Sequence, residues 1–467
     1  MLERFHFLYT NDLHSYFDHW SRVATFFKLK RLEYEEREES YWLVDIGDHV
    51  DRVSPITEAT MGRANVGLLN DLDYDFITIG NNEGLTLAHN DLYHLYNDAK
   101  FKVIVSNLQC TKRENPEWLT RYQIVNSSGG ARIGLIGLTA PFNPYYHLLG
   151  WHLDDIFPTI EKVLVQLEGK TDVIILLSHL GIYEDERIAK HFPEIDVIIG
   201  GHTHHLLRSG EQVRNTLLTA AGKHCTHVGE VTITFDHSTK KVVDKQAVTT
   251  NITSFHRDLR TEQRLGELQE QADVILSKRI IEVDQPIKVN WFQETEIMKR
   301  FTEELRSWAK ADGAFLNAGL LLDEFSAGEI TYRDVHRNCP HPINPCLVSL
   351  TGAQLFEVAK IALSKPFMEL KLRGFGFRGE ILGRMVFSGF DVKTTFDGEG
   401  NESVQTILFK GEEVEQDKAY RVVTADTFTF GRLLPPVARS DKKELFLPEF
   451  LREILVRTLI EYQRSRQ

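Results

Sequence analysis

Five short motifs in the first 205 residues contain side chains that bind divalent metal ions. In chain order they read DxH, GDxxD, GN, SH and GGHTH. Carboxylates, neutral imidazoles and an amide carbonyl suit Mn²⁺, Zn²⁺, Fe or Co better than Mg²⁺ alone. We therefore expect a metal centre in this part of the chain. Its predicted ligands are Asp12, His14, Asp48, Asn81, His179, His202 and His204.

Two ions in such a centre would support phosphoester hydrolysis. A carboxylate between two divalent ions about 3.5–4 Å apart can bridge them, and a hydroxide held there attacks phosphorus while the ions neutralise the developing charge. Asp48 is the natural bridging candidate because its loop is short and follows Gly47, which allows the backbone to approach the cations closely. We therefore predict that Asp48 is catalytic as well as a ligand.

Each motif by itself has a simpler structural explanation. A single histidine such as His14 or His179 is more often a hydrogen-bonded structural residue than a ligand. Asp12 alone would suit a helix N-cap, and Asn81 alone would suit a turn. The joint pattern favours the metal interpretation, because all five motifs directly follow an expected strand.

The elements that must position these motifs alternate short apolar runs with amphipathic segments. This rhythm is typical of an α/β domain with largely parallel, buried strands. In such sheets ligands bind beyond the carboxyl ends of the strands, where loops distant in sequence meet. The expected strands are residues 5–9, 41–46, 76–79, 103–105, 133–138, 173–177 and 197–199, and the expected helices are residues 22–37, 58–70, 88–97 and 159–167.

The pattern changes after residue 235. Residues 257–278 are polar and helical with one apolar stripe, which indicates a connecting helix. Helical stretches mixed with short strands and Gly-rich loops follow. We expect a metal domain at 1–250, a connecting segment at 251–285 and an α+β domain at 286–467.

The composition argues against a nucleic-acid polymer or a membrane as partner. The formal net charge is −13, which disfavours broad attraction to either. There is no run of about 18 apolar residues, and the N-terminus lacks the basic-then-apolar pattern of a signal peptide. The four cysteines are scattered and form no CxxC pair. We therefore expect a cytoplasmic protein without a disulfide framework; its oligomeric state stays open.

The order of the motifs resembles the calcineurin-like metallophosphoesterases, and more narrowly the 5'-nucleotidase family. LYTNDLHS is similar to the opening of that family, and LLTAAGKHCTHVGEVTITFD to the stretch that closes its metal domain. Residues 313–352, MVFSGFDV and YRVVTADTFTFG resemble parts of its substrate-binding domain. The resemblance covers nearly the whole chain, and the N-terminal motifs are its most specific part.

This resemblance implies a four-layer αββα metallophosphoesterase domain followed by an α+β substrate-binding domain. It also implies two divalent ions and a nucleotide or nucleotide-like phosphate as the small-molecule partner. One ion would be held by Asp12, His14, Asp48 and His204, and the other by Asp48, Asn81, His179 and His202.

The stretch at 80–85 departs from the family pattern GNHEFD. The family's His–Asp pair stabilises the transferring phosphoryl group, whereas these positions are Asn82 and Leu85 here. Losing such a group typically costs about 10²–10⁴-fold in rate. Three interpretations stay open: Asn82 donates a hydrogen bond to a phosphoryl oxygen with reduced activity, another histidine takes the role, or the protein has become a binder or sensor that hydrolyses slowly. The histidines near the metal motifs in sequence are His49, His205 and His224.

The second domain departs as well. The family's N-x-GGIR, whose arginine grips the substrate, reads NAGLLL from Asn317. In the family, two aromatic residues of this domain sandwich the nucleobase. Core packing explains each aromatic residue at least as well, and solvent-facing arginines are common, so the nucleotide preference rests on analogy. The candidate substrate-binding residues are Phe375 and Phe377 with Phe428 or Phe430, together with Arg373, Arg378 and Asn317.

The sequence thus supports two hypotheses. The first is a cytosolic two-metal hydrolase of nucleotide-like phosphoesters, with Asp48 and Asn82 in the catalytic positions. The second is a metal-bound nucleotide-binding or sensing protein with vestigial catalysis, and its motivation is the missing His–Asp pair.

Overall fold

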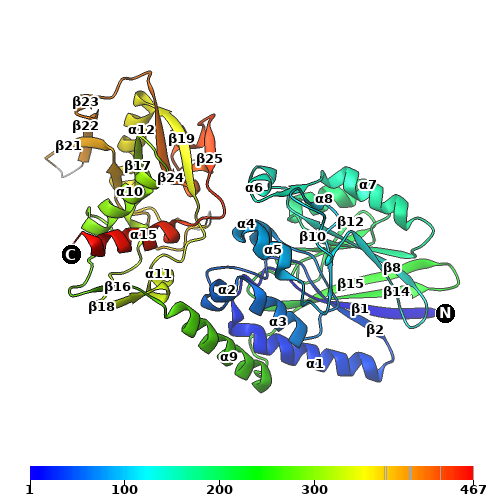
Figure 1. Ribbon diagram of the computed structural model, residues 1–467. Helices are drawn as coiled ribbons and strands as arrows, with labels where there is room; N and C mark the ends of the chain where they lie inside the picture. The colour runs from blue at the N-terminus through cyan, green and yellow to red at the C-terminus, as the bar shows by residue number, and fades with distance from the viewer. Residues whose placement is uncertain (373, 375, 399–401, 432, 466–467) are drawn as a thin grey trace. The chain divides into compact units, whose positions relative to one another are not determined.

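The computed structural model describes residues 1–372, 374, 376–398, 402–431 and 433–465, and it divides into two compact units, Met1–Ala272 and Asp273–Gln467 (Figure 1). The strands of the first unit are β1 (Leu2–Thr10), β2 (Ser40–Asp45), β3 (Phe76–Ile77), β4 (Lys102–Ile104), β5 (Leu108–Cys110), β6 (Leu119–Thr120), β7 (Tyr122–Asn126), β8 (Arg132–Thr139), β9 (Trp151–Leu153), β10 (Val173–His179), β11 (Val197–Gly200), β12 (Glu211–Val213), β13 (Thr216–Thr219), β14 (His227–Asp236) and β15 (Lys241–Asn251). Its α-helices are α1 (Trp20–Glu36), α2 (Pro55–Thr60), α3 (Arg63–Asp71), α4 (Asn81–Thr86), α5 (His89–Leu95), α6 (Asn143–Leu148), α7 (Ile156–Leu167) and α8 (Ile182–His191). The helix α9 (Leu259–Leu276) begins in this unit and includes the boundary between the units, after Ala272.

Two sheets form the centre of this unit. One has the strand order β15-β14-β1-β2-β3-β4-β6, and the other has the order β12-β13-β11-β10-β8-β7. Apolar side chains from both sheets pack together in one core, which includes Phe7, Ile46, Leu135 and Ile175. The outer face of the second sheet is covered by α7 and α8, and α1 contacts β2 of the first. These are the four layers of the expected αββα domain, and the prediction is confirmed.

The strands that precede the metal motifs run parallel. β1 pairs with β2, β2 with β3, and β10 with both β8 and β11, all in parallel register. Their residues are buried on both faces because a second sheet or helices lie on each side, which explains runs such as VIILLS in β10. The loops that follow β1, β2, β3, β10 and β11 therefore leave the two sheets at the carboxyl ends of these strands.

One expected helix is two helices. The stretch at 58–70 breaks between α2 and α3, where Met61 and Gly62 adopt φ of 48° and 82°. Left-handed backbone at two successive residues cannot continue an α-helix. A methyl group at Gly62 would meet Leu95 and Val50 at 3.2 to 3.3 Å, so close packing also favours glycine there.

The second unit has an α+β architecture, as expected. Its main sheet has the order β20-β17-β24-β19-β25, and β21, β22 and β23 form a separate antiparallel sheet. Its strands are β16 (Arg279–Val283), β17 (Gly313–Asn317), β18 (Gly328–Thr331), β19 (Pro345–Thr351), β20 (Met385–Ser388), β21 (Phe390–Phe396), β22 (Glu402–Phe409), β23 (Glu412–Glu413), β24 (Ala419–Ala425) and β25 (Lys443–Leu445). Its α-helices are α10 (Glu296–Trp308), α11 (Tyr332–Asn338), α12 (Gly352–Ala362), α13 (Lys365–Met368), α14 (Pro435–Ala438) and α15 (Leu451–Arg464). Among the described residues of both units, none of the helices combines the length and apolar character needed to span a bilayer.

Candidate metal centre

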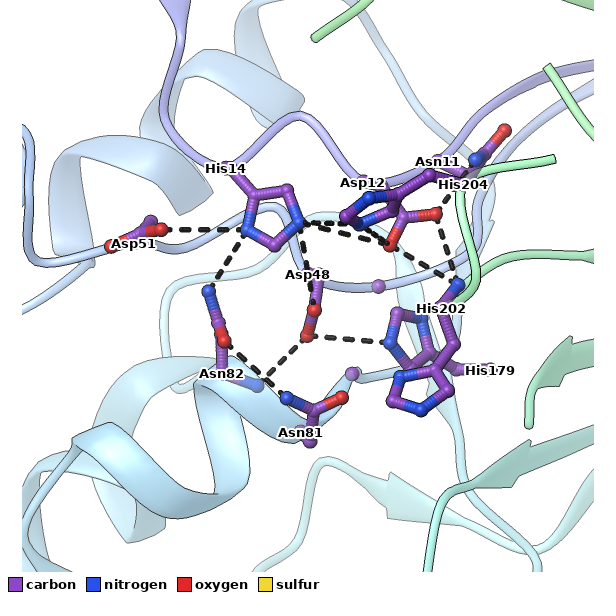
Figure 2. A network of polar contacts seen from close by, with 12 residues as sticks. Asn11, Asp12, His14, Asp48, Asp51, Asn81, Asn82, His179, His202 and His204 are labelled. Carbon is purple, nitrogen blue, oxygen red and sulfur yellow. Dashed lines mark hydrogen bonds and ion pairs between the residues drawn. The ribbon is translucent and has the colours of Figure 1, made fainter. Parts of the chain in front are cut away.

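The predicted ligands converge from both sheets of the first unit. Six of them form two groups of three side chains, and within each group the potential ligand atoms lie within 4.8 Å of one another. Figure 2 shows their side chains directed toward a common centre, with Asn81 and Asn82 approaching it from α4. Loops after β1, β2 and β11, the end of β10 and the start of α4 supply these residues. The groups are Asp12 with His14 and His204, and Asp48 with His179 and His202.

Asp48 lies between the two groups. Its Oδ2 is 3.8 Å from Nε2 of His14, in the first group, and its Oδ1 is 3.4 Å from Nε2 of His179, in its own group. In the first group, Nε2 of His204 lies 3.4 Å from Oδ1 of Asp12. Each oxygen of the Asp48 carboxylate therefore faces a different set of donor atoms, which is the arrangement that a bridging ligand requires.

The backbone around the site is strained. L-residues rarely adopt positive φ, and each such residue costs on the order of 1–3 kcal/mol, which the surrounding structure must offset. Hydrogen bonds hold two of the predicted ligands with positive φ, Asp12 and His14, to the loop after β2. The N–H of Asp12 donates to Gly47 O (3.0 Å), and the N–H of His14 donates to Asp48 O (2.8 Å). Strain of this kind clusters at functional sites. The predicted ligands with φ of 49° to 71° are Asp12, His14, Asp48, His202 and His204.

Two glycines let the β2 and β3 loops touch. A Cβ at Gly80 would lie 2.0 Å from Oδ1 of Asp48, and a Cβ at Gly47 would lie 2.3 Å from the backbone nitrogen of Gly80. Gly47 also has a φ of 88°, which disfavours a side chain on conformational grounds. These glycines therefore allow Asp48 to occupy its place between the two groups.

The electrostatics concentrate negative charge in a buried place. Burial alone would raise the pKa values of Asp12 and Asp48, but the facing histidines outweigh it and hold both below their usual range. Burial opposes the charged form of His179 as well, yet the charge of Asp48 raises the pKa of His179 to about 10. Two ionised carboxylates are thus buried side by side, and cationic partners stabilise them.

The donor atoms fit divalent cations. Nδ1 of His179 lies 2.7 Å from Ile46 O, so the ring donates its Nδ1–H to the backbone and directs Nε2 at Asp48. Metal-bound histidines are commonly oriented in this way. Within the described part of the chain, Oδ1 of Asn81 is buried without a hydrogen-bond partner, and Nε2 of His179 is buried with only a long, 3.4 Å approach to the Asp48 carboxylate. Buried polar atoms without partners are rare in proteins, and here a cation would satisfy both.

Asn82 contacts the ligands. Its backbone N–H donates to Oδ1 of Asp48 (2.8 Å), and its side-chain Nδ2 lies 3.0 Å from Nδ1 of His14. Its Oδ1 accepts a long hydrogen bond of 3.4 Å from Nδ2 of Asn81. The amide is therefore engaged within the site. Leu85, one turn further along α4, is partly buried.

The three histidines near the motifs have different surroundings. His49 is buried against Trp20, with ring centroids 5.1 Å apart, and burial lowers its pKa to about 3. His205 is exposed and its Nδ1 lies 2.9 Å from the Thr203 hydroxyl. The half-buried ring of His224 lies 6.0 Å from the ring of His14. Of these three, His224 has a ring that packs against the ring of His14, a predicted ligand.

Some supporting residues were not singled out from the sequence. Oδ2 of Asp51 lies 3.4 Å from Nδ1 of His14, and Nδ2 of Asn11 donates to Oδ2 of Asp12 (2.7 Å). The buried carboxylate of Glu83 accepts the N–H groups of Asp48 (3.0 Å), Val50 and Gly80 (both 2.8 Å). The second Asp of GDHVD and the Glu of GNNE were the available signals, because polar residues inside such short motifs commonly orient their neighbours.

The candidate substrate-binding residues of the second unit are in varied environments. Asn317 is 2% exposed and its Nδ2 donates to Leu382 O (2.8 Å), while Phe377 is 3% exposed and stacked on His341 at 5.1 Å. Phe428 is also buried. This geometry favours structural roles for all three. Arg378 is exposed and Phe430 partly so. Arg373 and Phe375 lie outside the described residues.

Comparisons with known proteins match both units. The calcineurin-like phosphoesterase model matches residues 5–206, and the model for the 5'-nucleotidase C-terminal domain matches residues 277–432. The chain is 41% identical over 456 residues to the uncharacterized metallophosphoesterase YunD of Bacillus subtilis. The aligned region covers 97% of this chain and 99% of that protein. It is 23% identical to a 5'-nucleotidase of Vibrio cholerae, over 77% of this chain and 75% of that one.

Solved structures share the fold. A 5'-nucleotidase precursor from Thermus thermophilus superposes with a TM-score of 0.61 at 19% identity, covering 98% of this chain and 96% of that one. At this identity the likeness shows the fold alone.

Proposed function

Because this chain belongs to the 5'-nucleotidase family of calcineurin-like metallophosphoesterases, we propose that it is a dinuclear metal-dependent hydrolase of nucleotide-like phosphoesters. Metal-dependent phosphoester hydrolysis is the chemistry of the family. The number of ions, the substrate and the residue roles are our proposal. Two divalent ions bound here would supply Lewis acidity and an activated water for attack on phosphorus.

The observation that carries the proposal is the position of Asp48. Its two oxygens face different histidines, His14 in one group and His179 in the other. We assign Asp12, His14 and His204 to one ion, and Asn81, His179 and His202 to the other, with Asp48 shared. Asp51 and Asn82 act as positioning residues: Nδ1 of His14 either donates to Oδ2 of Asp51 or accepts from Nδ2 of Asn82, and either contact fixes the direction of its Nε2.

Substrate recognition is proposed for the second unit. The family resemblance supports this role, and among the described candidates Arg378 and Phe430 retain accessible surface. Arg378 would contact a phosphate or ribose, and Phe430 would stack on a base. The four cysteines are all described and all free, which supports the further proposal that the protein works in a reducing cytoplasm.

The test is a substrate screen with the purified full chain. We expect that protein loaded with Mn²⁺ or Zn²⁺ hydrolyses at least one substrate among nucleoside monophosphates, cyclic nucleotides and nucleotide sugars. Excess chelator should reduce turnover to the rate of the protein-free blank, and added Mn²⁺ should restore it. If no substrate is turned over above that blank with either metal, the enzyme proposal is wrong.

A second candidate function is nucleotide sensing with vestigial catalysis. The replacement of the family's His–Asp pair by Asn82 and Leu85 favours it, and one N–H of the Asn82 amide is already directed at His14. Calorimetry distinguishes the two candidates. Nucleotide binding to the metal-loaded protein without any turnover would support the sensor, whereas binding accompanied by phosphate or nucleotide release would support the hydrolase.

A further inference from the structure

Two aromatic rings stand at the border of the metal centre and have no part in holding it. The rings of Tyr16 and His224 are stacked, with centroids 4.9 Å apart and planes inclined by 28°. The ring of His224 meets that of His14 edge to face at 6.0 Å and 86°. Tyr16 is 44% exposed, so its ring retains surface that the fold does not use.

The backbone fixes this pair to the ligand loop. The N–H of His224 donates to the carbonyl of Asp12 (2.9 Å), and the N–H of Tyr16 donates to that of Leu13 (3.0 Å). Ser15 and His224 adopt φ of 52° and 57°, so both rings are presented by strained turns. Their position relative to Asp12 and His14 therefore follows from the same hydrogen bonds that shape the metal loop.

Packing alone does not account for Tyr16. A tyrosine that contributes to a core is largely buried, whereas this ring is partly exposed and rests on another partly exposed ring. A flat, accessible aromatic surface beside a phosphoester site suits a planar group attached to the phosphate. Stacking on an aromatic side chain is tolerant of the identity of the base, because every base has a π-face.

We propose that Tyr16 and His224 form a stacking platform for a leaving group that carries a planar aromatic ring, either an aryl alcohol or a nucleoside through its base, in the phosphoester bound at the metals. This inference rests on the proposed function and places the stacking surface in the first unit, instead of at Phe430, to which the proposed function assigns the base. The platform favours aromatic phosphoesters over aliphatic ones and discriminates little among bases.

The test compares aromatic and aliphatic substrates. In the Mn²⁺-loaded full chain, Tyr16→Ala should lower kcat/KM for p-nitrophenyl phosphate and adenosine monophosphate by about 5- to 150-fold, mainly through KM. Hydrolysis of glycerol phosphate should be unchanged, and Tyr16→Phe should retain near wild-type values. His224→Asn, which tolerates the left-handed backbone, should act like Tyr16→Ala. Tyr183→Ala, at another exposed tyrosine of the same unit, is the matched control.

A binding measurement separates this inference from the proposed function. Calorimetry with adenosine monophosphate should show weaker binding to Tyr16→Ala than to wild type at equal metal content. If wild type hydrolyses none of the substrates, the proposed function fails, and the binding comparison still decides the platform. Equal effects on aromatic and aliphatic substrates, or unchanged adenosine monophosphate binding, would overturn the platform while leaving the hydrolase proposal in place.

Discussion

Replacing Asp48 with asparagine should lower kcat/KM of the metal-loaded protein by about 10³-fold or more. The carboxylate directs one oxygen to each group of ligands, whereas an amide has a single oxygen and would turn an N–H donor toward one cation. Each ion stabilises the transition state by several kcal/mol, and about 1.4 kcal/mol corresponds to a tenfold change in rate. Steady-state kinetics on the best substrate from the screen measure the loss.

The control for this variant is Asp71→Asn. Asp71 is 49% exposed and pairs with Arg264 on the surface of the same unit, so kinetics and thermal unfolding should match wild type. Thermal unfolding of Asp48→Asn with and without metal shows whether the fold persists. Turnover like that of wild type, in a folded variant with the same metal content, would contradict the proposed role of Asp48.

Restoring the family's charged pair should have the next largest effect. The double variant Asn82→His with Leu85→Asp should raise kcat by about 10²–10⁴-fold, the typical contribution of a positioned proton-donating group. Residues 82 and 85 lie three apart on α4 and therefore share a helix face, so the introduced carboxylate can orient the introduced imidazole. The backbone N–H at position 82 continues to donate to Asp48.

Single variants separate the two roles of position 82. Asn82→His alone should give a smaller gain, because nothing orients the ring. Asn82→Ala removes the contact with His14 and should weaken metal affinity or activity by about 10–100-fold. A double variant that binds metal like wild type and is no faster would mean that another group already stabilises the phosphoryl oxygens.

The framework of the site could be predicted from the sequence. Buried strands of a parallel sheet read as apolar runs, and their loops must meet at the carboxyl edge. The residues after β1 and β2, which pair in parallel in one sheet, therefore had to lie near one another, whereas the loop after β11 belongs to the other sheet and reaches the same place through the packing of the two sheets. Asp48 was expected at the centre of the site because its loop is short and Gly47 precedes it.

The supporting contacts could not be predicted, because side-chain direction depends on packing between distant segments. Asn82 follows Asn81 in the sequence, yet its side-chain amide contacts His14, which belongs to the loop after β1. Phe377 lies in a Gly-rich stretch that suits an exposed loop, and only the position of His341 shows that its ring is covered. The short helix α4 was missed because six residues containing glycine carry little helical signal.

Whether these loops hold two ions with Asp48 between them can be seen in a crystal structure of the Mn²⁺-loaded protein, with anomalous scattering recorded at the manganese edge. We expect two anomalous peaks about 3.5–4 Å apart. One peak should lie among Asp12, His14 and His204, the other among Asn81, His179 and His202, with Asp48 in contact with both. A single peak, or peaks away from these side chains, would contradict this expectation.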